Sequence, residues 1–476
     1  MNLTTIHNYN IKFYLFSILI AATIVIVLPV LPQLIILPFL VLLYFVYREN
    51  FMILLVILAF VTATGFILEE KRSLVNLLLI SITGVVFFRY YGFDLKKYPS
   101  LPKYYLQFLG LLFSMLIISS LFSNHMSTSL IATLRTAIFL TISYAFYSFL
   151  FMIKDTYLYI YALFLAVVVL SFGIMLQIME AGFTLFLIEG GLARFSGFYA
   201  NPNYVGHILI ITVSFIITFY FRESFKDKIK IIWLTAFLIL NLFIIFAVDS
   251  RASALAILIS TSFILLTLNK RIYFTLLFSV GLVFLILYLI PSIQELVDIF
   301  MRVERLDTRT YFWEAGIDVI SDYPIFGVGP DQFQNFIFTY LPSEAYKYFQ
   351  PDVWFGTKAN PHNFFLLMIS ENGLLGILTS LSLFVLYFYF GFRAIKMTKH
   401  DHYDIYLLSV SLTGIGFGIF IRAFYEVTGI MSYGYITRDL PFWLLLNVLM
   451  FINVKYSNWG SNPAPSTPKD DLNVDH

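Results

Sequence analysis

The sequence predicts an all-α polytopic membrane protein, with about 12–14 transmembrane helices and one large helical loop on the periplasmic or extracellular side. Two observations lead to this fold class. Of the 476 residues, 60% are hydrophobic and only 12% are charged, about half the charged fraction of a soluble domain. Apolar runs long enough to cross a hydrocarbon core of about 30 Å recur along nearly the whole chain. Backbone groups in lipid must pair within their own segment, so these runs should be helices.

The predicted spans follow one another with short connections. Their approximate ranges are 12–29, 32–47, 51–68, 74–91, 104–122, 129–152, 156–178, 203–221, 231–248, 252–268, 272–290, 373–396, 404–424 and 439–454. If neighbouring runs merge, the total is about twelve. We expect a bundle of about eleven spans over 1–290, an outside helical loop over 291–361, a helix break with the last three spans over 362–455, and a tail over 456–476. The tail is rich in Ser, Pro, Asn and Asp, so it should be disordered.

Basic residues in the short connections predict the orientation. Lys and Arg concentrate in cytoplasmic loops, and here they gather in "DLKKYPSLPK", "RESFKDKIK", "LNKR" and "FRAIKMTKHDHY". These segments fall on one side of the membrane if the predicted spans alternate. Both termini are then cytoplasmic, and the large loop lies outside. The loop "EEKRS" (69–73) is a minor exception, because its two glutamates offset its basic residues.

The composition and the missing motifs exclude several kinds of chemistry. The chain has no cysteine, which excludes disulfides, thiolate metal sites and cysteine nucleophiles. Its net charge of +2 gives no indication of nucleic-acid binding. The outside segments contain no Asp-x-Asp or Glu-x-Asp pair, and the chain has no His-Glu-x-x-His, P-loop or Gly-x-Ser-x-Gly sequence. We therefore expect no metal and no cofactor, with cationic side chains in place of a metal ion.

Polar side chains at membrane depth are informative because they are costly, about 2.5–3.5 kcal/mol for an arginine at a helix centre. In "GGLARFSGFYANPNYVG" (190–206), Arg194 precedes Asn201 and Asn203 at the start of a span. Asn203 is a candidate helix cap, and helix N-termini attract anions. The alternative is a plain helix cap beside an arginine whose charge reaches the membrane surface.

Two further places carry arginines on the outside. "VDSRASALA" (248–256) is a tight turn between two apolar helices. Its Arg251 presents a planar fork that suits phosphate oxygens, and the alternative is a hairpin turn with a local ion pair to Asp249. In the outside loop, Arg305 and Arg309 approach the next predicted helix. A solvated helix face is the alternative for these two arginines.

The stretch "ANPHNFFLLMISENGLLG" (359–376) places His362 at the mouth of an apolar run. The helix that follows should be short, with a break at "ENG" and the true span from Gly373. This arrangement would aim an imidazole into a cavity at the membrane surface. An imidazole has an unperturbed pKa of about 6.5, so it can take a proton from a hydroxyl near neutral pH. A structural histidine is the alternative, and Glu371 is interpreted as a helix-break residue facing a polar interior.

Arg135 and Arg422 lie near the outer ends of predicted spans, where each could reach the surface or line the same cavity. Together these residues predict several arginines and one histidine that converge at the outer leaflet. Such a site suits an anionic lipid-linked substrate. The arginines would hold a diphosphate and stabilise it as a leaving group, the histidine would activate an acceptor hydroxyl, and the membrane bundle would bind the lipid tail.

This pattern resembles the O-antigen ligase and polymerase superfamily of bacterial envelopes. The ligases carry His, then Asn, Ser or Gln, nine residues, Gly, two residues, and Gly, Thr or Tyr. Here His362-Asn363 is followed by nine residues (364–372), Gly373, two leucines and Gly376. "RFSGFYANPN", "SRAS" and "RTYFWEAGIDVISDYPIFGVG" resemble three other segments of the family, so the resemblance runs from about residue 190 to 395.

The resemblance implies the fold of multispanning lipid-dependent glycosyltransferases, in the bacterial inner membrane with the site on the periplasmic or outer face. It implies metal-free glycan transfer from an undecaprenyl diphosphate carrier to an acceptor hydroxyl, by one displacement at the anomeric carbon with inversion. Carried over by motif, His362 is the general base, and Arg194 and Arg251 bind the diphosphate. The further candidates are Arg305 and Arg309 for diphosphate binding, and Asn201, Asn203, Asn363, Glu371, Arg135 and Arg422 as supporting residues.

The resemblance leaves the activity open. The His motif favours an O-antigen ligase, which acts on a lipid A core hydroxyl. A polymerase acts on another lipid-linked repeat, but its paired Arg-x10-Gly motifs are not apparent in this sequence. Relatives that glycosylate proteins act on Ser or Thr. A transporter of lipid-linked sugars, from another functional class, would need ionisable residues at the bilayer midplane, whereas the charges of this chain cluster at the predicted outer face.

Overall fold

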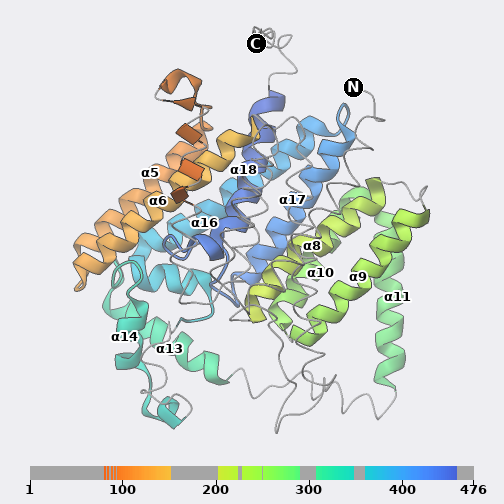
Figure 1. Cartoon of the computed structure of the whole chain (residues 1–476). Coiled ribbons are helices and arrows are strands. Elements are labelled where there is room, and N and C mark those ends of the chain that lie inside the picture. The colour runs from red at the N-terminus through yellow and green to blue at the C-terminus, as the bar shows by residue number, and fades with distance from the viewer. Residues whose placement is uncertain are drawn as a thin grey trace, which may run out of the picture.

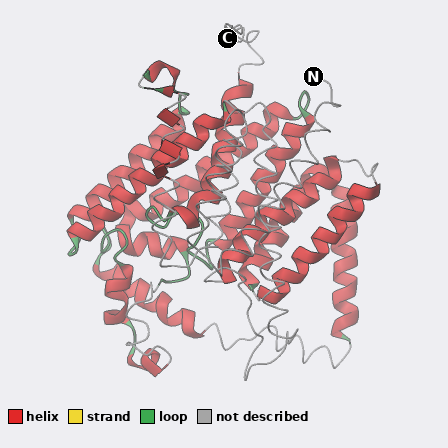
Figure 2. Ribbon diagram, viewed as in Figure 1, coloured by secondary structure: helices red, strands yellow, loops and turns green. Residues whose placement is uncertain are grey.

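The computed structural model of the chain describes residues 80–151, 202–222, 228–248, 250–289, 307–347 and 360–457, apart from a few positions between 82 and 93. Within these residues the regular elements are helices and no strand is present, as Figure 2 shows. Seven of the described helices are long and apolar enough to cross a membrane. The predicted fold class, an all-α polytopic membrane protein, is therefore confirmed.

The long helices match the predicted spans closely. They are α5 (Lys103–Leu121), α6 (Met126–Leu150), α8 (Pro202–Arg222), α9 (Lys228–Val248), α10 (Arg251–Leu268), α11 (Lys270–Tyr288), α16 (Phe364–Thr398), α17 (Tyr403–Arg422) and α18 (Ile436–Ser457). Shorter helices are η3 (Leu95–Lys97), α13 (Asp307–Asp322), α14 (Phe333–Tyr340) and η5 (Ser343–Lys347). The spans predicted over 12–29, 32–47, 51–68 and 156–178, most of 74–91, and the tail after Ser457 lie outside the described residues.

Helix α16 is central to the arrangement of the bundle. It packs against α5, α17 and α18, and α10 packs against α17 and α8. In Figure 1, α5 and α6 run side by side along one flank, while α8, α9, α10 and α11 form the other. Helix α16 contacts the first flank through α5, and α17 contacts the second through α8 and α10. Because α16 and α17 also pack on each other, side chains from distant parts of the sequence meet where these helices end.

The bundle has two distinct ends. Helices α13 and α14 cover one of them, which we call the loop end (Figure 1). Helix η3 and the join between α16 and α17 lie at the opposite end. The basic segments over 94–103 and 393–403 therefore lie at the same end, as the predicted alternation of spans requires. That the loop end faces the outside of the cell stays a prediction from the charge pattern.

Helix α16 is broken at Gly373, where the sequence predicts the break. Gly373 has φ 60° and ψ −149°, a conformation that glycine adopts without steric penalty. The break frees backbone groups, and the turn over 324–329 pairs with them. Val328 and Gly329 donate their N–H groups to the carbonyl oxygens of Ser370 and Glu371, at 3.1 and 2.8 Å. The polar backbone of the break is thus satisfied inside the protein, as a membrane environment demands.

Candidate active site

His362 sits in a strained turn between the loop segment and α16. Its φ is +49°, the left-handed region that costs a residue with a Cβ about 1–2 kcal/mol. Three contacts hold this turn. The His362 N–H donates to the side chain of Asn360 at 3.0 Å, Trp313 Nε1 donates to the carbonyl oxygen of Pro361 at 2.7 Å, and Asn363 caps α16 by accepting from the Leu366 N–H. A non-glycine residue held this way is typical of a functional site.

Glu426, from the connection between α17 and α18, is the acidic partner of His362. Its Oε1 lies 3.4 Å from His362 Nδ1, and its side chain is only 2% exposed. The other carboxylate oxygen accepts a hydrogen bond from the side-chain amide of Asn203 in α8. Nδ1 of His362 is itself buried, while the ring as a whole is 28% exposed. The accessible part of the ring therefore includes the side that carries Nε2.

The carboxyl group of Glu426 is ionised despite its burial. Burial by itself raises the pKa of Glu426, because desolvation penalises the charged form. The neighbouring His362, together with the positive charges of Arg422 and Arg309, outweighs burial and brings the pKa of Glu426 down to about 2. A buried negative charge thus faces the imidazole at any physiological pH.

Arg422 connects the segments that form this site. Its guanidinium is 1% exposed and donates to the carbonyl oxygens of Thr428 and Asn203, at 2.7 and 2.8 Å, and to the Thr428 hydroxyl at 3.1 Å. It thereby joins α17 to the first turn of α8 and to the connection that carries Glu426. Its NH1 and NH2 groups both bond to protein oxygens, so Arg422 holds the site together.

Asn203 also differs from its predicted role as a helix cap. It is the second residue of α8, and its side chain reaches across to Glu426. The first turn of α8 packs tightly on α10, since a Cβ added to Gly206 would lie 2.0 Å from the Ser253 hydroxyl oxygen. Arg251 is the first residue of α10 and is partly exposed. The turn that bears Arg251 is therefore adjacent to the turn that bears Asn203.

Arg309 brings a cationic side chain from the loop end. It lies in the first turn of α13 and donates to the carbonyl oxygen of Tyr425 at 3.3 Å, next to Glu426 in the chain. Its charge acts on both Glu426 and Arg422. The side chain is partly exposed, so Arg309 is open to a ligand. The structure thus brings His362, Arg309 and Arg422 together around Glu426, and their roles in substrate binding and catalysis stay predictions.

Two other predicted site residues, Glu371 and Arg135, make contacts within the protein away from His362. Glu371 is 2% exposed and accepts from the Phe333 N–H at 2.8 Å, so it ties α14 to the helix break. Arg135 lies on α6 and pairs with Asp331 at 2.5 Å, and its NH1 group donates to the Tyr435 hydroxyl at 3.3 Å. Arg194, Arg305 and Asn201 lie outside the described residues.

The sequence interpretation missed Glu426 altogether. Its one signal is its position four residues after Arg422, in "RAFYEVTG", at the end of a predicted span. The sequence interpretation also missed Tyr204 in the first turn of α8, and Arg438 and Tyr435, which lie close to each other, with Arg438 also close to Tyr204. Among the described residues, no group of three or more His, Asp or Glu side chains is close enough to hold a metal ion.

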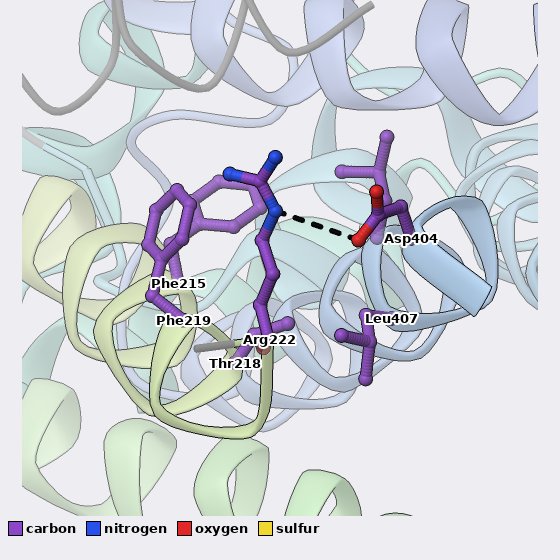
Figure 3. A pocket seen from close by; sticks show the side chains of 7 residues that line it. Phe215, Thr218, Phe219, Arg222, Asp404 and Leu407 are labelled. Atoms are coloured by element: carbon purple, nitrogen blue, oxygen red, sulfur yellow. Dashed lines mark ion pairs between the residues drawn. The ribbon is translucent and has the colours of Figure 1, made fainter. Parts of the chain in front are cut away.

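A small pocket lies at the far end of α8 from Asn203. Arg222 and Asp404 form an ion pair there at 3.4 Å, as Figure 3 shows. The other lining residues are Phe215, Thr218, Phe219, Leu407 and Leu408. Along the helix, Arg222 is about 28 Å from Asn203. This pocket is therefore separate from the site around His362.

Comparison with known families identifies the central part of the chain. Residues 236–381 match the family model described as O-antigen ligase. This central stretch is similar to the O-antigen ligase family. The matched domain runs from within α9 into α16, so it includes Arg251, Arg309 and the stretch from His362 to Gly376. Glu426 and Arg438 lie beyond the matched residues of the domain.

One curated relative adds to this match. The chain is similar to the exopolysaccharide production protein ExoQ of Rhizobium meliloti (strain 1021), with 28% identity over 138 residues. The similar stretch covers 28% of this chain and 29% of that protein. Together with the O-antigen ligase domain, it supports membership of the O-antigen ligase and polymerase superfamily.

Proposed function

We propose that the protein transfers a glycan from an undecaprenyl diphosphate-linked donor to an acceptor hydroxyl, with His362 as general base and no metal ion. The observation that carries the proposal is the 3.4 Å contact between the buried His362 Nδ1 and the carboxylate of Glu426. A carboxylate beside Nδ1 keeps a proton on that nitrogen, which leaves Nε2 as the basic atom. Nε2 belongs to the accessible part of the ring, where an acceptor hydroxyl can approach.

In the proposed reaction the acceptor oxygen attacks the anomeric carbon of the donor sugar. The hydroxyl proton passes to Nε2 of His362, and Glu426 stabilises the imidazolium that forms. The bond between the anomeric carbon and the diphosphate oxygen breaks, and its electron pair leaves with the diphosphate. A single displacement of this kind inverts the anomeric configuration.

The leaving diphosphate needs positive charge. Arg309 is partly exposed beside the Glu426 segment, and Arg251 starts the helix that packs on α8. We propose these two residues, with Arg194 and Arg305, as its binding groups. Guanidinium groups match phosphate oxygens in pairs and stabilise charge that develops on the leaving group. The bacterial inner membrane, with the loop end on the outer face, is the proposed location.

An O-antigen ligase that acts on a lipid A core hydroxyl is the preferred activity, because the O-antigen ligase domain carries the complete His motif. A repeat-unit polymerase is the second candidate. The similarity to a protein named for exopolysaccharide production favours it. The two activities would share His362, Glu426 and the arginines, and would differ in the acceptor.

The test uses the full chain purified in detergent, an undecaprenyl diphosphate-linked oligosaccharide and EDTA. One reaction contains a lipid A core as acceptor, and the other contains more of the lipid-linked repeat. Product on the core alone supports the ligase, and a ladder on the carrier alone supports the polymerase. The variant His362→Gln should lose at least about 100-fold in rate, whereas His400→Ala, at an exposed position of the opposite end, should keep it. Full activity of His362→Gln, or no product with either acceptor, would contradict the proposal.

A further inference from the structure

Arg438, in the first turn of α18, lies close to two tyrosine rings. The carbon at the centre of its guanidinium lies 5.5 Å from the ring centroid of Tyr204 and 5.0 Å from that of Tyr435. A guanidinium over an aromatic face within about 6 Å is attracted by the ring. The two rings, from different parts of the chain, therefore fix where the positive charge of Arg438 is held.

Arg135 extends the same arrangement from α6. Its guanidinium lies 4.9 Å from the ring centroid of Tyr435, so this ring has a guanidinium from each of two helices nearby. We call Tyr204, Arg438, Tyr435 and Arg135 the arginine–tyrosine stack. Arg135 is neutralised by Asp331 at 2.5 Å.

Arg438 forms no such ion pair within the described part of the chain, although Asp439 is close enough for the two charges to interact. Its Nε is buried and makes no hydrogen bond there. The nearest carboxylate in the sequence, that of Asp439, accepts instead from the backbone and side chain of Ser432. Arg438 is also the first residue of a candidate membrane span, at a depth where a guanidinium can reach the membrane surface. The fold therefore holds the guanidinium of Arg438 in place and leaves its N–H groups available to a ligand.

The stack adjoins the proposed catalytic pair. Tyr204 directly follows Asn203, whose side chain donates to Glu426, and Glu426 contacts His362. A group bound at Arg438 would therefore lie near the first turn of α8, which also carries Asn203. Arg309 approaches Glu426 from α13, so the two partly exposed arginines reach the site from different elements.

We propose that the arginine–tyrosine stack is an anion-binding subsite, in which Arg438 takes a phosphate group of a lipid-linked substrate. The identity of the substrate rests on the proposed function, whereas the anion binding does not. The phosphate has two possible sources: the diphosphate of the donor, or a phosphate of the lipid that carries the acceptor. In either case Arg438 presents NH groups to phosphate oxygens, while Tyr204 and Tyr435 hold the guanidinium plane.

Binding is tested first, with inorganic pyrophosphate as the probe and thermal unfolding of the purified full chain as the readout. Pyrophosphate should raise the Tm of the wild-type protein in a saturable way, since a ligand that binds only the folded state stabilises it. Arg438→Gln should weaken the apparent affinity at least about tenfold, and Arg438→Lys should weaken it less. Arg222→Gln, which breaks the ion pair at the opposite end of α8, is the matched control and should bind as the wild type does.

Three results would overturn the subsite. One is a wild-type protein that millimolar pyrophosphate does not stabilise. Another is a folded Arg438→Gln variant with wild-type affinity. The third applies if Arg438→Gln does not fold. In that case the subsite is contradicted when Arg438→Lys binds pyrophosphate with wild-type affinity and when this affinity depends on salt concentration as it does in the wild type. None of these needs glycan transfer, so a wild-type protein that binds pyrophosphate but transfers no glycan contradicts the proposed function alone.

Kinetics then separates the two sources of phosphate. If Arg438 holds the donor, Arg438→Gln raises the KM for the lipid-linked donor at least about fivefold and leaves the KM for the acceptor unchanged; if it holds the acceptor, the reverse is expected. The double variant with Arg309→Gln gives a second criterion. Two arginines on one diphosphate should show non-additive effects, and two arginines on different substrates should show additive ones. Unchanged KM values for both substrates in Arg438→Gln would contradict the role in substrate binding.

Discussion

Trp313 of α13 donates its indole N–H to the carbonyl oxygen of Pro361, the residue before His362, at 2.7 Å. This bond connects a helix of the loop end directly to the turn that holds the proposed general base. Because His362 has a positive φ, the turn is stable only as long as its surroundings hold it. The position of the imidazole therefore depends on α13 as well as on α16.

Trp313→Phe should lower kcat about three- to tenfold and leave the KM for the donor near the wild-type value. The variant keeps an aromatic ring but loses a neutral hydrogen bond, worth about 0.5–1.5 kcal/mol. Steady-state kinetics measures this effect. Tyr340→Phe is the control, because it removes a hydrogen bond to Asp322 within the same loop segment and should leave kcat unchanged. Equal losses in the two variants would mean that the loop segment acts only through its overall stability.

Glu426→Gln should lower kcat by about 10- to 100-fold. The amide has nearly the shape of the carboxylate but lacks its charge, so it cannot stabilise the imidazolium that forms when His362 takes the proton of the acceptor hydroxyl. Steady-state kinetics measures kcat of the variant and of the wild type. An unchanged kcat would show that Glu426 does not act on the charge of His362.

The stability of the wild-type protein should also show the ionisation of Glu426. The pKa of this carboxyl is about 2 in the folded protein, below its ordinary value of 4.5, so its ionised form stabilises the fold. That contribution is complete above pH 4.5 and is lost as the pH falls towards 2. The Tm difference between the wild type and Glu426→Gln should therefore be constant above about pH 5 and shrink below pH 4.5. A difference that grows on acidification would contradict this sign.

Gly373→Ala should lower the free energy of unfolding by about 2 kcal/mol or more. Gly373 has a positive φ, and an added Cβ would lie 2.1 Å from the carbonyl oxygen of Ile325. The control is Gly110→Ala in α5, where an added Cβ meets nothing within 4 Å, and there the change should be neutral or stabilising by up to about 1 kcal/mol. Thermal unfolding in detergent compares the two. Similar Tm values would show that the break in α16 does not need glycine.

Arg422→Lys should reduce stability and activity together. Two different nitrogens of Arg422 donate to the carbonyl oxygens of Thr428 and Asn203. A lysine ends in a single nitrogen that cannot occupy both positions, and each buried acceptor left unpaired costs about 1–3 kcal/mol. The expected result is a Tm several degrees lower. Arg393→Lys is the control, since this exposed guanidinium donates to the Tyr389 hydroxyl. A normal Tm with reduced donor binding in Arg422→Lys would instead assign Arg422 to the substrate.

The helices of the fold could be predicted from the sequence because each apolar run carries its own signal. The break at Gly373 could be predicted for the same reason, since "ENG" lies within the run it interrupts. Residue roles were harder to predict. The sequence places Arg422 near the outer end of a predicted span. Whether its guanidinium serves a substrate or protein carbonyls depends on Asn203 and Thr428, which no local pattern brings together.

Contacts between distant segments explain the missed residues. Glu426 lies in a short connection whose sequence gives no reason to expect a histidine nearby. Arg438 precedes an apolar run, where an arginine that reaches the membrane surface is the ordinary interpretation. Its distinguishing feature is the pair of tyrosine rings around it, and one of these, Tyr204, comes from α8. The contacts of Glu426 and Arg438 form only when α8 packs against the connection between α17 and α18, so the sequence alone does not show them.

The short helical segment between His362 and Gly373 sets the distance and the rotation between the helix break and the imidazole. Its far end is fixed by the backbone pairing with the turn over 324–329, and its near end carries the imidazole. Each residue of an α-helix adds about 1.5 Å of rise and about 100° of rotation. Inserting one residue into this segment would therefore turn His362 away from Glu426 even if every side chain were retained. The spacing of nine residues is as much a part of the site as the residues at its two ends.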